Sequence, residues 1–235
     1  MKIKNILLGN KFFYWIYKFQ KIYKNIKPNH HYGEYGEDIF INRFFKNFKK
    51  GFYVDIGCYH PIKGSLTYQL FKKGWSGLNV DISEGSIDLF KIARPGDMNV
   101  NCAITNINKK VYYFQNSKIN QQNSLIRTSK SQKKISINGY NFNSLLRKLK
   151  IKKIDFLNID TEGTEIEIIK SIDFKKFHPT LITIEENSFN YNEKNKLIIS
   201  KILKKNGYYL VNIIGVTMIF INKNYYKKIK KFVKI

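Results

Sequence analysis

Cysteine is scarce in this chain, and the two cysteines present are not arranged as a pair. Cys58 and Cys102 stand far apart, with no Cys-x-x-Cys spacing and no cluster of histidines near either of them. Disulfide-rich secreted domains and structural zinc sites both need such spacing. The sequence therefore excludes a disulfide framework and a zinc motif.

Long apolar runs are also missing. No stretch approaches the ~18–20 consecutive apolar residues that a membrane-spanning helix needs. The N-terminal segment begins with lysines, but Lys11 interrupts its apolar stretch and no small-residue cleavage site follows. This segment fits neither a signal peptide nor a membrane span, so the cytoplasm is the expected location.

Acidic residues and arginines are few. The 235 residues include 42 Lys and Arg against 17 Asp and Glu, which gives a formal net charge of +25. Only four of the basic residues are arginine (Arg43, Arg94, Arg127 and Arg147). Arginine is the side chain that pairs bidentately with phosphates and bases. The charge alone therefore does not indicate a nucleic-acid-binding protein, and nucleic acid is disfavoured as a partner.

The few acids are concentrated in one part of the chain. Residues 1–33 and 194–235 contain many lysines and no acid, whereas residues 155–193 hold nine acids and three lysines. Glu165, Glu167 and Asp173 in this acidic segment also fit a solvated helix face. Asp160 and Glu162 fit that interpretation less well, because they follow a buried-looking strand. A dense group of acids in a lysine-rich chain indicates a functional role.

Apolar residues make up 43% of the chain, enough for one α/β domain with a full core. Short apolar runs alternate with helical periodicity, which favours a parallel sheet covered on both faces. The last two strands meet at Gly215 with almost no loop and predict an antiparallel hairpin at one edge. The polar stretch 116–138 is expected to be a long loop. The expected strands are 52–57, 78–82, 99–104, 111–115, 155–160, 181–185, 208–214 and 217–221; the expected helices are 12–26, 37–48, 64–73, 86–92, 142–149, 164–170 and 193–205.

The first two strands indicate a nucleoside-binding site. The strand at 52–57 ends in Asp55-Ile56-Gly57, and the next strand ends in Asp81. An acid at that second strand end can accept hydrogen bonds from both hydroxyls of a ribose, and ligands of open α/β sheets bind at these strand ends. The Gly-x-Gly-x-x-Gly pattern that holds a pyrophosphate is absent. A cofactor with a ribose and no pyrophosphate fits better, which favours S-adenosylmethionine.

With the acidic segment added, the chain resembles the FkbM family of S-adenosylmethionine-dependent methyltransferases over roughly residues 33–222. The most specific match is the Asp-x-Glu-Gly-x-Glu block at residues 160–165. The other matching stretches are 36–38, 51–57, 65–67, 74–81, 101–104, 123–125, Pro179 and the acids at 185–186. The sequence departs from the usual family pattern at Cys58, Leu66 and Asp81-Ile82, where Ala, Asn and Glu-Pro are common.

The resemblance implies an α/β fold: a Rossmann-like seven-stranded methyltransferase sheet with helices on both faces and a C-terminal antiparallel hairpin. It also implies methylation of a hydroxyl oxygen, commonly on a sugar or natural product. The predicted cofactor-binding residues are Asp55, Gly57, Cys58, Asp81, Ile82, Asn101, Cys102 and Ala103. Cys58 and Cys102 are expected to pack against adenine rather than to react.

Three residues are candidates for removing the proton of the acceptor hydroxyl. Asp160 ends a strand that should lie beside the first, Glu162 follows on the same turn, and His60 lies in the first loop. An alternative is that Asp160 with Glu185 or Glu186 holds Mg²⁺, which favours carboxylate oxygens. In the other alternative Asp160 contacts only the cofactor and no metal binds.

The ends of the chain differ from its centre. Residues 1–32 are expected to be a basic, aromatic helical extension, residues 33–222 the methyltransferase domain and residues 223–235 a basic tail. Aromatic side chains alternate with lysines in both ends, as in helices that bind anionic membrane surfaces. RNA contact and a lysine-rich surface without a partner stay open as alternatives.

The predicted function is O-methylation of a saccharide, a glycan precursor or a related natural product. One alternative is a methyltransferase of RNA or protein nitrogen, but the aromatic-proline tetrapeptide typical of such enzymes is absent after the strand at 155–160. The other is a non-catalytic cofactor-binding or scaffold module. That alternative would need a damaged cofactor site, whereas Asp55, Gly57, Asp81 and Asp160 are all present.

Overall fold

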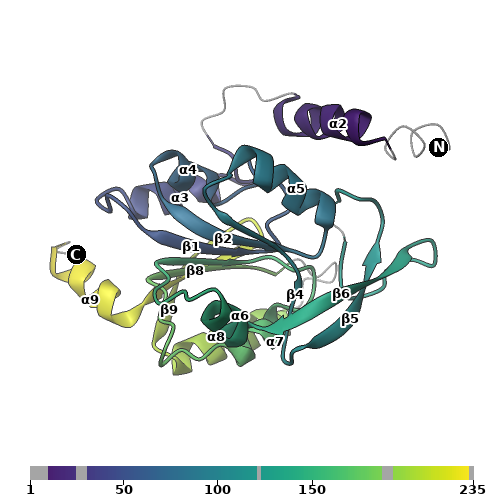
Figure 1. Ribbon diagram of the computed structural model, residues 1–235. Coiled ribbons are helices and arrows are strands. Elements are labelled where there is room, and N and C mark those ends of the chain that lie inside the picture. Colours follow the sequence, from purple (N-terminus) through teal and green to yellow (C-terminus); the bar gives the residue numbers. More distant parts are fainter. Residues whose placement is uncertain (1–9, 25–30, 121–122, 187–192, 233–235) are drawn as a thin grey trace.

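A seven-stranded sheet forms the centre of the computed structural model, which describes residues 10–24, 31–120, 123–186 and 193–232 (Figure 1). The strand order is β3-β2-β1-β7-β8-β10-β9, and β10 runs antiparallel to both of its neighbours, while the other pairings are parallel. This order confirms the predicted Rossmann-like sheet with a C-terminal antiparallel pair. The strands are β1 (Phe52–Ile56), β2 (Ser76–Asp81), β3 (Met98–Asn101), β7 (Phe156–Ile159), β8 (Leu181–Glu185), β9 (Tyr208–Ile214) and β10 (Thr217–Asn222).

The central strands are apolar because both of their faces are covered. All four residues of β7 and four of the five in β1 are buried. Successive side chains in a strand point to opposite faces, so Val54 and Ile56 belong to one core and Tyr53 to the other. Near-continuous apolar runs of this kind are typical of parallel sheets between two helical layers.

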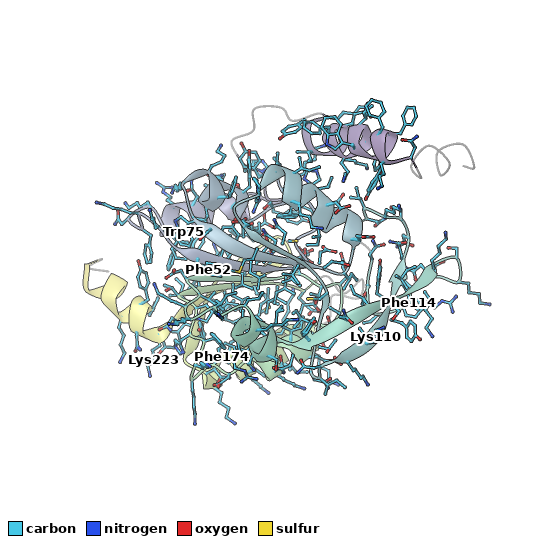
Figure 2. All side chains as sticks on the ribbon, in the orientation of Figure 1. Phe52, Trp75, Lys110, Phe114, Phe174 and Lys223 are labelled. Atoms are coloured by element: carbon cyan, nitrogen blue, oxygen red, sulfur yellow. The ribbon has the colours of Figure 1, made fainter. Side chains whose placement is uncertain are left out.

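Helices cover the two faces in separate groups (Figure 1). One core contains side chains of α6 (Phe142–Lys148), α7 (Glu165–Ser171) and α8 (Glu193–Lys205). The opposite face carries α3 (Glu37–Phe44), α4 (Tyr68–Lys72) and α5 (Glu84–Ala93). Figure 2 shows Trp75 and Phe174 on opposite sides of the sheet, in these two cores. Two further helices, α2 (Lys11–Tyr23) and α9 (Lys223–Phe232), come from the basic ends of the chain.

The expectation of a long loop at 116–138 was wrong for its last six residues. Strand β6 (Lys133–Asn141) pairs with β5 (Lys109–Gln115) and with β4 (Ala103–Thr105) in a second, three-stranded sheet. The alternation of Ile135 and Ile137 with polar residues is the signal of a half-buried strand. The predicted strand at 99–104 divides at Cys102, because β3 stays in the main sheet and β4 leaves it.

The helical lengths give no membrane span. Among the helices that the structure describes, none combines the length and the apolar character that crossing a bilayer requires.

Candidate active site

A pocket opens at the carboxyl ends of β1, β2, β7 and β8. Its volume is about 1100 Å³, counting the part open to solvent, which is ample for a nucleoside-sized ligand. Strand order reverses at this edge, since β2 lies on one side of β1 and β7 on the other. Seven carboxylates line the pocket, and the described lining includes no Lys, Arg or His. The seven are Glu34, Glu37, Asp55, Asp81, Asp160, Glu162 and Glu185.

Gly57 lets the end of β1 approach the end of β7 closely. Its φ of 81° is in the left-handed region, and a Cβ at this position would overlap the carbonyl oxygen of Asp160. The Gly57 N–H donates to the Val80 carbonyl at 2.9 Å. The turns after β1, β2 and β7 are therefore packed backbone to backbone, which places the side chains of Asp81 and Asp160 around one space.

Asp81 is held at the pocket by two backbone N–H groups, one from the loop after β1 and one from the turn after β2. The N–H groups of Tyr59 and Ser83 donate to its two carboxylate oxygens at 2.8 and 2.7 Å. Burial raises the pKa of Asp81 to about 6, although these two hydrogen bonds act in the opposite direction. Each oxygen keeps a further lone pair, so the carboxylate can accept hydrogen bonds from a ligand in the pocket.

Asp55 is tied into a polar chain that crosses the sheet. Thr67 Oγ1 donates to one carboxylate oxygen at 2.8 Å, and Asn158 Nδ2 donates to the other at 2.9 Å. Thr183 Oγ1 in turn donates to Asn158 Oδ1 at 2.7 Å. Because these bonds use the carboxylate inside the protein, Asp55 acts as the anchor of the pocket floor. Sequence analysis missed Asn158 and Thr183 because each lies within an otherwise apolar strand.

Arg94 supplies the positive charge behind this floor, and its side chain is fully buried. Its guanidinium donates to Thr67 Oγ1 and Ser65 Oγ, each at 2.8 Å, and to the Pro61 carbonyl. The ring of Phe90 lies 4.9 Å from the guanidinium carbon. Arg94 therefore holds the loop after β1 and, through Thr67, the carboxylate of Asp55. Sequence analysis gave Arg94 no role.

Asp160 and Glu185 form a carboxylate pair at the ends of β7 and β8, which pair as neighbouring parallel strands. Burial and the charge of Glu185 raise the pKa of Asp160 well above its usual range. Burial and the charge of Glu162 raise the pKa of Glu185 to about 7, and a hydrogen bond from Asp160 moderates the shift. The pair therefore holds a proton near neutral pH, and a cation in the pocket would favour its release.

The turn that follows Asp160 is stabilised by Glu165. Its carboxylate accepts hydrogen bonds from the N–H groups of Thr161 and Gly163, at 2.9 and 3.0 Å. Ser124 Oγ, from the stretch between the β5 and β6 strands, donates to the Glu162 carbonyl at 2.9 Å. Burial, followed by the charge of Glu165, raises the pKa of Glu162, which lines the pocket as predicted.

The proposal of His60 as a proton acceptor is not supported by its position. His60 is buried outside the pocket lining, and its Nδ1 accepts from the N–H groups of Ile62 and Lys63 at 3.1 and 3.0 Å. Its Nε2–H then donates to the Lys21 carbonyl at 2.9 Å. Burial lowers the pKa of His60 to about 4. Both ring nitrogens are occupied, so His60 joins the first loop to α2.

Of the carboxylates proposed to hold Mg²⁺, Asp160 and Glu185 come together in the pocket and Glu186 does not. Asp160 and Glu185 line the pocket, but Glu186 lies outside its lining and accepts a hydrogen bond from Asn195 Nδ2 at 3.1 Å. In the part of the chain that the structure describes, no group of three or more His, Cys, Asp or Glu side chains is placed to hold a metal ion. These donors do not fit the proposed metal site.

The remaining predicted cofactor residues divide into two groups. Cys58, Ile82 and Cys102 line the pocket. Asn101 and Ala103 do not: Asn101 Nδ2 donates to the Asp81 carbonyl at 2.9 Å, and Ala103 belongs to β4 of the second sheet, where it packs with Tyr113 and Ile137. Burial raises the pKa of the Cys58 thiol well above its usual range and that of Cys102 to about 12. Both thiols are therefore protonated and suited to packing rather than to reaction.

Several pocket residues were not identified as site residues from the sequence. Glu34 and Glu37 precede and begin α3, and Asn120, Asn123 and Leu125 belong to the excursion between the β5 and β6 strands. Two signals pointed toward them. Residues 36–38 match the family pattern, and long loops in compact domains are often functional.

Comparison with known protein families identifies a methyltransferase domain in this chain. The sequence pattern of the methyltransferase FkbM domain matches residues 55–210, which is more than half of the chain. A comparison with curated proteins finds no match.

Two solved structures illustrate how distant the structural neighbours are. A TehB-like SAM-dependent methyltransferase from Corynebacterium glutamicum is 13% identical, with a TM-score of 0.46 over 89% of this chain and 97% of its own. A precorrin-6y C5,15-methyltransferase from Geobacter metallireducens is 10% identical, with a TM-score of 0.40 over 85% of this chain and 94% of its own. These similarities are too weak to indicate a substrate.

Proposed function

The chain belongs to the FkbM family of S-adenosylmethionine-dependent methyltransferases, and on this premise we propose that it methylates a hydroxyl oxygen of a saccharide, a glycan precursor or a related natural product. One observation carries the proposal. A half-buried carboxylate pair, Asp160 with Glu185, lies in the same pocket as the ribose-binding candidate Asp81.

The residues of the pocket fit S-adenosylmethionine. The cofactor supplies an activated methyl group on a cationic sulfonium, and its amino group carries a second positive charge. A lining of seven carboxylates without a basic side chain among its described residues is complementary to those charges. Asp81 would accept hydrogen bonds from the ribose hydroxyls, while Cys58, Ile82 and Cys102 would pack against the adenine.

Asp160 and Glu185 would remove the proton from the acceptor hydroxyl. A hydroxyl becomes a better nucleophile as a neighbouring carboxylate takes its proton, and general bases contribute about 10²–10⁴-fold to such reactions. The elevated pKa values make this pair a stronger base than an exposed carboxylate, provided that it is ionised. A positive charge in the pocket favours the ionised form, so cofactor binding and activation of the base support one another.

The acids at the pocket favour a neutral acceptor over a polyanion. Glu34, Glu37 and Glu162 come from the loop before α3, its first turn and the turn after β7. Carboxylates accept hydrogen bonds from the hydroxyl groups of a sugar, whereas they repel phosphates. An RNA strand would approach seven carboxylates in this pocket with no compensating cation among the described lining residues. The charge therefore supports a saccharide rather than RNA as the acceptor.

The test is methyl transfer from labelled S-adenosylmethionine to neutral saccharides, amino sugars and RNA, with mass spectrometry of the products. The expected product carries a methyl ether on a sugar oxygen. Methylation of RNA nitrogen without any sugar product would contradict the proposed substrate class. Binding of the cofactor without turnover on any acceptor, in a panel that includes natural-product alcohols, would instead favour the scaffold alternative.

A further inference from the structure

Helix α2 carries a row of aromatic side chains that the fold leaves uncovered. Phe12, Trp15, Phe19 and Tyr23 recur at spacings of three and four, which places them on one side of the helix. Phe12 is 65% exposed and Trp15 is 51% exposed. The rings of Trp15 and Phe19 lie 4.6 Å apart, and those of Phe19 and Tyr23 lie 5.5 Å apart. We name these four residues the aromatic row.

The opposite side of α2 is already occupied by the protein. Ile22 is fully buried, Tyr14 OH donates to Asp88 Oδ2 on α5 at 3.3 Å, and Lys18 Nζ lies 3.8 Å from the same oxygen. The Lys21 carbonyl accepts the hydrogen bond from His60. Figure 1 shows α2 lying on the outer side of the layer that contains α5. Because the helix is held on this side, the aromatic row cannot turn into the core.

Lysines accompany the aromatic row, and residues 10–24 contain no acid. Lys11 at the start of the helix and Lys24 at its C-cap are exposed, whereas Lys21 lies beside Tyr17, with its Nζ 5.7 Å from the centre of that ring. Figure 2 shows side chains of α2 projecting away from the body of the protein. Aromatic rings prefer the boundary between water and hydrocarbon, and lysines near them are attracted to anionic headgroups.

We propose that this face of α2 binds the surface of a membrane rich in anionic phospholipid. The aromatic row enters the headgroup region, and Lys11 and Lys24, at the two ends of the helix, pair with lipid phosphates. Anionic lipid fits better than a second copy of this chain, because the lysines on the two copies would repel one another. It fits better than RNA, because residues 10–24 contain no arginine, the side chain that planar contacts with bases and phosphates favour.

Binding at α2 would place the membrane close to the pocket. His60 belongs to the loop that also contains the pocket residues Cys58 and Tyr59. Lys118, just before the pocket residue Asn120, lies with its Nζ 4.8 Å from the centre of the Tyr14 ring. The helix thus contacts both segments that border the pocket opening.

The experiment is flotation of the full chain with two kinds of vesicle. One contains phosphatidylcholine alone, and the other also contains about 30% phosphatidylglycerol, an anionic lipid. We expect binding to the anionic vesicles alone and a fall in binding as salt is raised, because exposed charges are screened over about 10 Å at 0.1 M salt. The double variant Trp15→Ala/Phe19→Ala should bind at least about tenfold more weakly, from the apolar area it removes. The matched control is Tyr112→Ala, which removes an aromatic ring that is 56% exposed on β5, and it should bind like the wild type.

Tryptophan fluorescence identifies the inserted face directly. The chain has two tryptophans, and Trp75 is only 3% exposed. Brominated lipids quench only rings that reach the bilayer, so they should quench Trp15 in the wild type and leave the emission of Trp15→Phe unchanged.

Three results would overturn the proposal. The first is equal binding to neutral and anionic vesicles, and the second is anionic-vesicle binding that survives Trp15→Ala/Phe19→Ala. The third is tight binding of single-stranded RNA or self-association in place of vesicle binding, measured by fluorescence anisotropy and light scattering. Circular dichroism of each variant distinguishes these outcomes from loss of the fold.

Discussion

The pocket and helix α2 both contact the loop that follows β1, and their charges are opposite. The pocket is lined by seven carboxylates, most of them buried or half-buried. Residues 10–24 hold Lys11, Lys18, Lys21 and Lys24, with no acid, and expose aromatic rings. His60 connects the two regions through its hydrogen bond to the Lys21 carbonyl.

The contrast shows that the excess of lysine is found at solvated positions and does not reach the pocket. Solvated positions tolerate lysine at little cost, so the surface of a chain with a charge of +25 becomes basic. The pocket keeps its acids although they repel one another and raise the pKa values of Asp160 and Glu185. Active-site residues often serve function at a cost in stability. Here a cationic ligand would relieve the repulsion between the carboxylates of the pocket. Four changes test this contrast.

The largest effect is expected from Arg94→Met, which removes the cation behind the acidic pocket. Arg94 is the one Lys or Arg among the described residues that is fully buried. Its loss leaves Thr67, Ser65 and Asp55 without their charged partner, and removing one member of a buried charged network costs about 3–5 kcal/mol. Urea unfolding measures the change. Arg94→Lys keeps the charge without the planar fork and should be destabilised less; equal stability of Arg94→Met and the wild type would contradict this role.

The second effect is on turnover. Asp160→Asn keeps the size of the side chain but removes its capacity to take a proton, so kcat should fall by about 10²-fold or more. The matched control is Glu167→Gln, an exposed acid of the same acidic segment that does not line the pocket. Near wild-type kcat for Asp160→Asn would exclude Asp160 as the base.

The same assay addresses the metal. Because the described residues include no group of three or more side chains placed to hold a metal ion, turnover of the wild type is expected to persist in EDTA. Loss of activity in EDTA, with recovery on added Mg²⁺, would restore the metal interpretation for Asp160 and Glu185.

The third effect is on cofactor affinity. Asp81→Ala should weaken binding of S-adenosylmethionine by about 1.5–3 kcal/mol for each charged hydrogen bond lost. It also releases the N–H groups of Tyr59 and Ser83, so the first loop should become less ordered. Calorimetry measures the affinity, with Asp173→Ala on the surface as the control. Unchanged affinity would remove Asp81 from the cofactor site.

The smallest effect is the dependence on pH. The pKa of Glu185 is raised to about 7, so the carboxylate pair loses negative charge as the pH falls below that value. Affinity for the cationic cofactor should therefore rise between pH 6 and pH 8, by at most about tenfold per unit for one released proton. Glu185→Gln should flatten this dependence, as measured by calorimetry in buffers of different ionisation enthalpy.

The stability of the ligand-free protein should change in the opposite direction. A carboxyl group whose pKa is raised on folding binds a proton more tightly in the folded state, so its contribution is present at acidic pH and is lost as the pH rises through about 7. The Tm of the wild type should therefore fall relative to that of Glu185→Gln between pH 5 and pH 8. Parallel Tm curves for the two proteins would contradict the raised pKa.

Much of the fold follows from patterns that are local in the sequence. Largely apolar runs close to Gly, Pro or an acidic residue predict β1, β2, β7 and β8, because central parallel strands are buried on both faces. Strand β6 was missed because the polar residues before it suggested a loop, and its isoleucines are buried only through pairing with distant β5. The tail after residue 222 forms α9, which packs Tyr225 and Tyr226 near the core; its lysines alone did not predict a helix.

Which side chains end the strands can be read from the amino-acid pattern, so Asp81, Asp160 and Glu185 were expected to meet at one edge of a parallel sheet. How each side chain is used depends on the folded arrangement. It buries the ring of His60 against α2, turns Glu186 toward Asn195 and places Arg94 behind Asp55. Short-range apolar patterns fix where each strand begins and ends, whereas hydrogen-bond partners and burial depend on contacts between segments that are far apart in the chain.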